Sequence, residues 1–169
     1  FVKANFSGRT FLRSDYTTNM IFDDVSDTFT GIGKTYALTV GGANTSGKIP
    51  IGWSGQKDAD SKSALIHAWE SNINHWDTAD VYGEGRAEQL IGEQWNTIPR
   101  QDIFLATKVG WDKGSHAFWY EPKHMINNME RSLRNLKTDY VDVMYLHHCN
   151  FGNNDENFED ALEAIKRFQ

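Results

Sequence analysis

The sequence predicts an α/β protein of the parallel (β/α)8 TIM-barrel class, with four strand–helix units in this chain. Apolar, strand-like segments alternate with helical segments four times between residues 35 and 168. Such alternation predicts parallel strands joined by right-handed crossovers, a pattern that doubly wound sheets and eight-stranded barrels share. A doubly wound sheet should carry a glycine-rich dinucleotide fingerprint after its first strand. The loop at that place, GGANTSG (41–47), does not have the required spacing, which favours a barrel.

Composition limits the class of protein. The chain has 169 residues, of which 39% are hydrophobic and 24% charged, as in an ordinary globular domain. We expect no membrane span, because no apolar run reaches about 18 residues. A net charge of −6 with scattered Lys and Arg argues against nucleic acid as a partner. The single cysteine, Cys149, excludes an internal disulfide and a thiolate zinc site, and suits a cytoplasmic location. We therefore expect no metal site.

The first elements follow a weakly patterned start. Residues 1–26 are polar and aperiodic, and we expect an extension with little structure of its own before a domain over 27–169. Residues 28–36 (TFTGIGKTY) predict a short hairpin with its glycines near the turn. Residues 35–42 (TYALTVGG) then predict the first strand of the parallel sheet.

The middle of the chain predicts two helices and one strand. Apolar residues at helical spacing predict a helix over 61–71, with Asn72 as its left-handed C-terminal cap. The next strand is expected over 73–80 (INHWDTAD). A short helix over 88–95 follows, with Leu90, Ile91 and Trp95 on one side.

The last four elements repeat the alternation. A nearly continuous apolar strand over 102–110 is interrupted by Lys108. Residues 123–136 predict an amphipathic helix just after Pro122, 139–148 predict a strand, and 158–168 predict the last helix. The apolar stripe of the helix over 123–136 comprises Met125, Ile126, Met129, Leu133 and Leu136.

Four polar residues stand at or just beyond the ends of three successive predicted strands: Asp77, Tyr82, Lys108 and His147. Taken alone, each is more simply a structural residue, such as a satisfied core group or a lysine whose head reaches water. In a barrel, however, the C-terminal strand ends meet at the face that carries active sites. We therefore expect the four side chains to converge on one pocket.

An acid, a phenol, an amine and an imidazole can together donate a proton. A free phenol has a pKa of about 10, and a nearby ammonium stabilises the phenolate and lowers that value. A carboxylate would keep the ammonium charged and in place, while the imidazole could hold a substrate carbonyl. The matching hydride would have to come from a cofactor, because no side chain supplies one.

Three stretches resemble the aldo-keto reductase family: INHWDTADVYGEGRAEQLIG, LATKVG and SLRNLKTDYVDVMYLHH. The resemblance covers residues from about 27 to 169, in the family's order and spacing. It implies an NADPH-dependent, or sometimes NADH-dependent, reductase of small-molecule carbonyls. It also implies that Tyr82 is the general acid, that Lys108 tunes it, that Asp77 pairs with Lys108, and that His147 rather than His148 orients the carbonyl.

The resemblance further assigns cofactor and substrate residues. Gly42 and Ala43, in the turn after the first barrel strand, would approach the nicotinamide together with Asp77. Trp111 could line the substrate pocket, and ordinary loop packing explains it equally well. Ala87 departs from the family, which commonly has Ser before Glu88. Loss of such a cap costs about 1 kcal/mol of helix stability.

The family has eight strand–helix units, whereas this chain has four. The loops that bind the phosphates of the cofactor commonly follow strands seven and eight. We therefore expect the remainder of the barrel as a continuation or a second chain, with a homodimer of half barrels as a less favoured option. Open strand edges and an uncovered apolar face would otherwise invite association. Two alternatives stay open: a non-catalytic binding or regulatory module, and an inactive fragment of the same fold.

Overall fold

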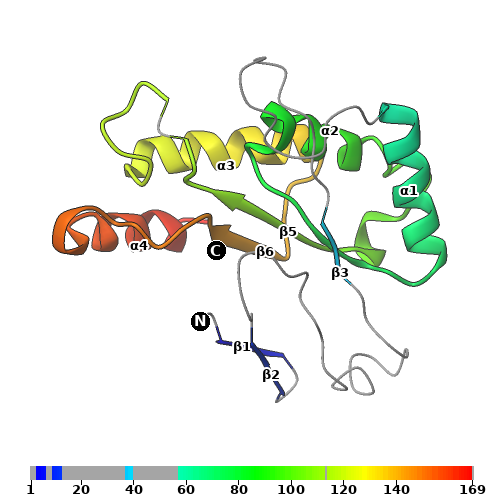
Figure 1. The fold of residues 1–169 in the computed structure, drawn as a ribbon, viewed down its shortest axis with the longest axis horizontal. Coiled ribbons are helices and arrows are strands. Elements are labelled where there is room, and N and C mark those ends of the chain that lie inside the picture. Colours follow the sequence, from blue (N-terminus) through cyan, green and yellow to red (C-terminus); the bar gives the residue numbers. More distant parts are fainter. Residues whose placement is uncertain (1–2, 7–8, 13–36, 40–56, 113, 169) are drawn as a thin grey trace.

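A four-stranded parallel sheet forms the centre of the fold (Figure 1). The computed structural model describes residues 3–6, 9–12, 37–39, 57–112 and 114–168. The strands are β3 (Ala37–Thr39), β4 (His75–Asp77), β5 (Phe104–Val109) and β6 (Val143–Leu146). They lie side by side in chain order, and each neighbouring pair is parallel. This order has no reversal of the kind that a doubly wound sheet requires.

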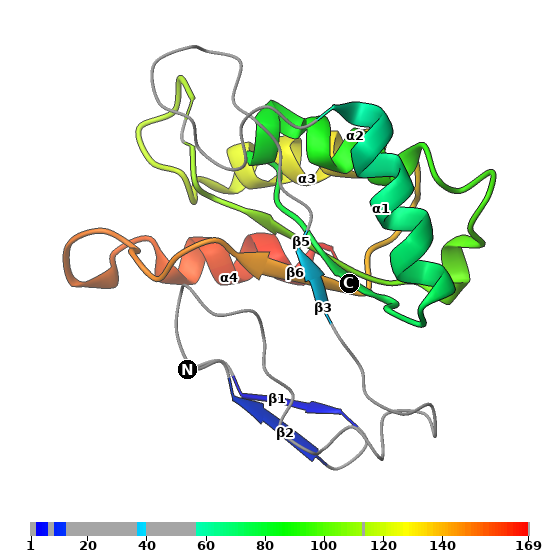
Figure 2. The same cartoon turned by 45° about the vertical axis from the view of Figure 1, so that its right-hand side comes forward.

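Four helices connect and cover these strands (Figures 1 and 2). The first three pack on one another in sequence, and the fourth packs on the third. This arrangement matches the predicted alternation of strand and crossover helix. The helices are α1 (Asp58–Glu70), α2 (Arg86–Gly92), α3 (Pro122–Leu136) and α4 (Phe158–Lys166).

Helix boundaries differ from the predicted ones for local reasons. Helix α1 begins three residues before the predicted start, and Asp58 and Asp60 in its first turn complement the helix dipole. Its end agrees with prediction, because Asn72 is left-handed with φ 60°. Helix α2 ends at Gly92 rather than at residue 95. A Cβ at Gly92 would lie 2.5 Å from the carbonyl oxygen of Asn135, so α3 approaches α2 closely there.

The described strands are shorter than predicted. The predicted strand over 73–80 is regular only at His75–Asp77, and the one over 139–148 only at Val143–Leu146. Beyond β4, however, the amides of Thr78 and Asp80 still donate to the carbonyls of Ala106 and Lys108, at 2.9 and 3.1 Å. The chain therefore follows β5 past the formal end of β4, and this keeps the next loop beside the sheet.

Two clusters of buried apolar side chains form the core. Trp76, on β4, is fully buried and stacks on Trp95 with ring centroids 6.2 Å apart. The first cluster contains Leu65, Trp76, Ala87, Ile91, Ile98, Ile103, Leu105 and Leu136. The second, under α3 and α4, contains Val109, Tyr120, Met125, Met129, Ala161 and Ala164.

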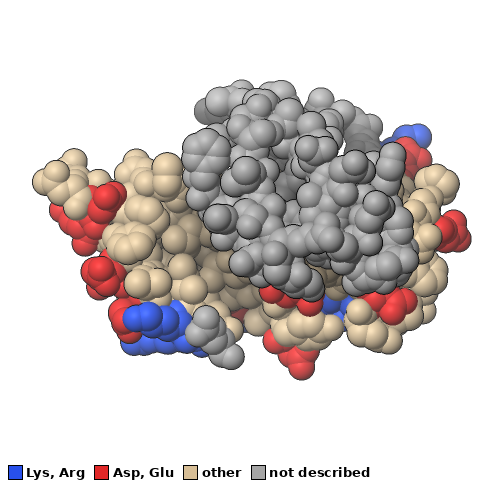
Figure 3. Space-filling view, turned by 90° about the horizontal axis from the view of Figure 1, so that it is seen from below, with Lys and Arg blue, Asp and Glu red and all other residues tan. Residues whose placement is uncertain are grey.

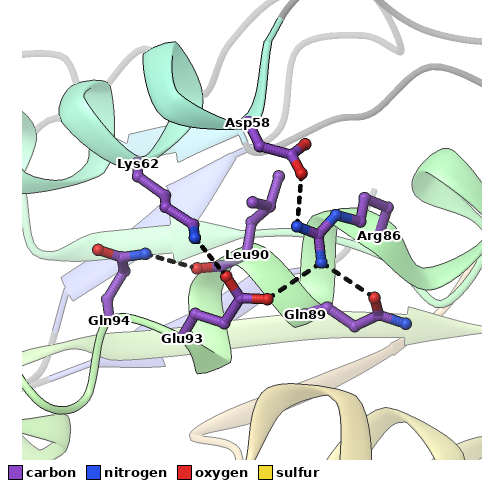
Figure 4. A network of polar contacts seen from close by, with 7 residues as sticks. All are labelled: Asp58, Lys62, Arg86, Gln89, Leu90, Glu93 and Gln94. Atoms are coloured by element: carbon purple, nitrogen blue, oxygen red, sulfur yellow. Dashed lines mark hydrogen bonds and ion pairs between the residues drawn. The ribbon is translucent and has the colours of Figure 1, made fainter.

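Helices α1 and α2 are also tied by a surface network around Arg86 (Figure 4). The Arg86 guanidinium lies 2.6 Å from Asp58 on α1 and 3.1 Å from Glu93, and it donates to Gln89 at 3.1 Å. Lys62 of α1 contacts the other oxygen of Glu93 at 2.6 Å. These charges are partly exposed, so each pair contributes little stability, at most about 1 kcal/mol.

The N-terminal segment contains a small sheet of its own. Strands β1 (Lys3–Phe6) and β2 (Arg9–Leu12) pair antiparallel within the segment expected to have little structure. The hairpin predicted over 28–36 lies outside the described residues. Among the helices that the structure describes, none has the length and apolarity needed to cross a membrane. Figure 3 views the molecule from below. Around the edge of this face, where the described residues are visible, acidic side chains are spread with basic ones among them.

Candidate active site

A buried ion pair joins two neighbouring strands at their C-terminal ends. The ammonium of Lys108, on β5, lies 2.6 Å from Oδ2 of Asp77, the last residue of β4. The same Nζ donates to the carbonyl of Thr78 at 2.8 Å. The two side chains are only 9% and 19% exposed. A cation taken out of water requires compensation of this kind, so the carboxylate and carbonyl together hold the ammonium in place.

The loop after β4 sets Tyr82 against this ammonium. Nζ of Lys108 lies 5.1 Å from the centroid of the Tyr82 ring. Immediately after Tyr82, three successive residues have left-handed backbone, Gly83 (φ 58°), Glu84 (φ 57°) and Gly85 (φ 89°). L side chains rarely adopt this region, which accounts for two glycines in the YGEG turn. The turn reverses the chain into α2 and leaves the phenol at the end of the sheet.

His147 completes the group from the third strand. Its amide donates to the carbonyl of Val109 at 2.9 Å, which extends the pairing of β5 and β6 to the site. The imidazole and the Tyr82 ring have centroids 5.8 Å apart and meet edge to face at 83°. Trp111, just after β5, lies 4.9 Å from the same imidazole and is 52% exposed.

The structure thus gathers five residues expected at the site into one chain of contacts. Asp77 contacts Lys108, Lys108 lies against Tyr82, and Tyr82 and Trp111 both flank His147. Gly42 and Ala43 lie outside the described residues. A phenol beside an ammonium and an imidazole can donate a proton to a bound group. Among the described side chains, no three His, Cys, Asp or Glu residues gather as a metal site requires.

Two loops beside the site are joined by residues that sequence reasoning missed. Tyr120 is fully buried, and its hydroxyl donates to the carbonyl of His148 at 2.6 Å and accepts from the His148 amide at 3.1 Å. Burial lowers the pKa of His148, and a hydrogen bond with the Gly110 backbone opposes that effect. The run of three aromatic residues at 118–120, inside a predicted loop, was the available signal that this loop is packed.

A second missed group lies between the sheet and the helices. Glu88 of α2 is fully buried and accepts from Thr107 at 2.8 Å and from Asn135 at 3.0 Å. The pKa of Asp80 is raised to about 7, chiefly by burial and next by the charge of Glu88. Arg131 of α3 opposes this rise from 3.5 Å. Both carboxyls contact α3, so this group is separate from the Lys108 pair.

Comparison with known proteins identifies the family that this chain resembles. A family model described as "Aldo/keto reductase family" matches residues 37–169. The chain is 38% identical to "Uncharacterized oxidoreductase YqkF" of Bacillus subtilis, over 63% of this chain and 35% of that protein. It is 34% identical to a "Probable voltage-gated potassium channel subunit beta" of Oryza sativa, over 54% of this chain and 29% of that protein.

Solved structures agree with these relatives in fold. The aldo-keto reductase AKR11C1 from Bacillus halodurans, in its holo form, superposes with a TM-score of 0.56 at 33% identity. The match covers 67% of this chain and 38% of that one. The chain matches about a third of the length of these proteins, 35%, 29% and 38% respectively. The predicted fold class is confirmed: the sheet and its helices are part of a TIM barrel.

Proposed function

The chain belongs to the aldo/keto reductase family, and we propose that the protein is an NAD(P)H-dependent oxidoreductase that reduces aldehydes or ketones to alcohols. One observation carries the proposal. The Lys108 ammonium lies 2.6 Å from the Asp77 carboxylate and 5.1 Å from the centre of the Tyr82 ring. The imidazole of His147, which follows β6, meets the same ring edge to face. These contacts bring an ammonium and an imidazole next to a phenol, which supports a role of the phenol as proton donor.

Each of the four side chains has a distinct part in the proposed reaction. Tyr82 donates the proton to the carbonyl oxygen as the general acid. Lys108 stabilises the resulting phenolate, because an adjacent ammonium favours the charged form of a phenol. Asp77 holds the Lys108 ammonium in place and compensates its charge. His147 orients the substrate carbonyl by hydrogen bonding. Positioned general acids contribute roughly 10²–10⁴-fold in rate.

We propose that the site takes the reacting end of a nicotinamide cofactor. When bound, NADPH or NADH supplies the hydride that no side chain can provide. Asp77, with Gly42 and Ala43, which follow β3 in the sequence, would hold the nicotinamide end, and Trp111 would line the substrate pocket. The phosphate groups of the cofactor would need cationic side chains other than Lys108. The described arginines in ion pairs, such as Arg86 and Arg131, already face carboxylates.

The match to only about a third of the relatives' length and the partial burial of β6 support a partner for this half of the barrel. All four residues of β6 are only partly buried, whereas Leu105–Val109 on the neighbouring β5 are buried. We propose that the remainder of the barrel, as a continuation or a second chain, covers β6 and carries the phosphate site. The small-molecule carbonyl is the other partner; we propose no nucleic acid or membrane partner, and a cytoplasmic location.

A non-catalytic binding or regulatory module is the second candidate. It is favoured by the 34% identity to the protein named as a probable voltage-gated potassium channel subunit beta. An inactive fragment of the same fold is the third possibility. Both differ from the first proposal in one respect: neither requires proton donation by Tyr82.

Tyr82→Phe separates these functions, since it removes the hydroxyl and keeps the ring that lies against Lys108. We expect carbonyl reduction by the full-length protein to fall at least roughly 10²-fold, with NADPH affinity unchanged. Oxidation of NADPH with an aldehyde substrate measures the rate. Tyr140→Phe is the matched control, because Tyr140 is exposed and lies beside Arg100 at the other end of β6. If Tyr82→Phe reduced the aldehyde as fast as the wild type, the proposal that Tyr82 is the general acid of a reductase would be contradicted.

A further inference from the structure

Tyr120 joins the loop after β5 to the loop after β6 through one hydroxyl. That hydroxyl accepts from the amide of His148 at 3.1 Å and donates to its carbonyl at 2.6 Å. The amide belongs to the peptide bond between His147 and His148. Tyr120 therefore holds the backbone on the C-terminal side of His147, and it does so from a fully buried position.

The Tyr120 ring that carries this hydroxyl is closely packed against its neighbours. A Cβ at Gly110 would collide with Cε1 of Tyr120, so the glycine, with φ +98°, lets the ring lie directly on the end of β5. The ring also stacks on that of Phe151, with centroids 5.2 Å apart and an interplanar angle of 29°. Because the ring is enclosed in this way, its hydroxyl has little freedom to move away from His148.

A second aromatic residue supports the same loop. The indole N–H of Trp119 donates to the carbonyl of Asn150 at 2.9 Å. The ring of Trp119 meets the imidazole of His148 edge to face at 4.7 Å. Nδ1 of His148 in turn accepts from the Asn150 amide at 3.2 Å. The turn after His147 is thus bonded within itself and to the aromatic loop.

These contacts restrain His147 on both sides. Its own amide is bonded to Val109 at 2.9 Å, and the next residue is bonded twice to Tyr120. We propose that Tyr120 is a positioning residue for the reaction. By fixing the peptide after His147, it sets the edge-to-face approach of that imidazole to Tyr82, with ring centroids 5.8 Å apart. This inference rests on the proposed function, in which His147 orients the carbonyl.

Tyr120→Phe is the direct test, because the ring stays on Gly110 while both bonds to His148 are lost. In the full-length protein with NADPH and an aldehyde, we expect kcat to fall roughly 10- to 100-fold, the scale on which small misplacements act. KM and NADPH affinity should change little. The imidazole signals of His147 in NMR spectra should shift. A purely structural role would lower the amount of folded enzyme without changing kcat per folded molecule. Tyr140→Phe again controls for loss of a tyrosine hydroxyl.

Trp119→Phe provides a second variant if loss of both Tyr120 bonds impairs folding. It removes one bond, to Asn150, from a partly exposed side chain. We expect a smaller fall in kcat in the same sense, with KM unchanged. The proposal is overturned if the folded variants keep wild-type kcat and unshifted His147 signals while Tyr82→Phe is inactive. If Tyr82→Phe is itself fully active, the proposed function fails instead, and the two failures are distinguished.

Discussion

At the scale of single residues, the paired charges at the strand ends were predictable and the buried carboxyl behind them was not. Lys108 interrupts an apolar strand, Asp77 stands at the end of the preceding strand, and the resemblance to the aldo-keto reductases implies that they pair. Asp80 lies in the same motif, but its environment depends on α2 and α3. Its carboxyl has one oxygen without a hydrogen-bond partner and the other 3.5 Å from Arg131. No pattern along the chain reports such contacts between layers.

Asp80 is expected to make stability depend on pH. Its pKa is raised from 3.8 to about 7 in the folded protein, because burial and Glu88 outweigh Arg131. Between about pH 4 and 7 the folded state therefore binds more protons than the unfolded state, and stability falls as pH rises. This loss of folding free energy is complete above about pH 7 and amounts to a few kcal/mol at most.

Asp80→Asn should remove this pH dependence, because an amide does not ionise. We expect urea unfolding to give a flatter profile between pH 4 and 7 for the variant, and greater stability than wild type at pH 7. Asp102→Asn, at an exposed carboxyl, is the control. A profile for Asp80→Asn parallel to that of wild type would show that Asp80 titrates in its ordinary range.

At the scale of elements, the sequence predicted all four helices and the order of the strands, and it missed how the loops pack. Periodicity locates α3 well, since Met125, Met129 and Leu136 of its stripe are buried. The aromatic run at 118–120 carries no regular period. Its packing is set by the end of β5 and by the turn after β6, about 30 residues further along the chain. Such contacts follow from the tertiary fold and not from local pattern.

The turn between β4 and α2 depends on Gly85. Its φ is +89°, and an added Cβ would lie 2.8 Å from Nδ2 of Asn135, the side chain that donates to Glu88. Gly85→Ala should therefore add a steric conflict to backbone strain and destabilise the protein by about 1–3 kcal/mol. Chemical denaturation measures this difference.

Gly114→Ala isolates the steric part of that effect. Gly114 also has positive φ, +56°, but its added Cβ would meet only Cε1 of His124 at an ordinary 3.8 Å. Gly114→Ala should therefore lower the free energy of unfolding only by the strain of a left-handed alanine, about 1 kcal/mol. Equal losses in the two alanine variants would mean that the contact with Asn135 relaxes freely and does not constrain the turn.

At the scale of the whole molecule, we propose that the chain supplies the proton-donating side of a barrel active site. The alternation of elements and the absence of a dinucleotide fingerprint predicted the fold class, and the sheet order agrees with it. The completion of the barrel was inferred from what the chain lacks. The partly buried β6 edge supports that inference physically, since the sheet ends there in the described part of the chain.

The measurement that tests the central claim most directly is an NADPH titration of the full-length protein, followed by cofactor fluorescence and then by addition of an aldehyde. The account predicts saturable binding in both wild type and Tyr82→Phe, and NADPH consumption only in the wild type. Absence of NADPH and NADH binding, or equal consumption by the two proteins, would contradict a reductase in which Tyr82 donates the proton.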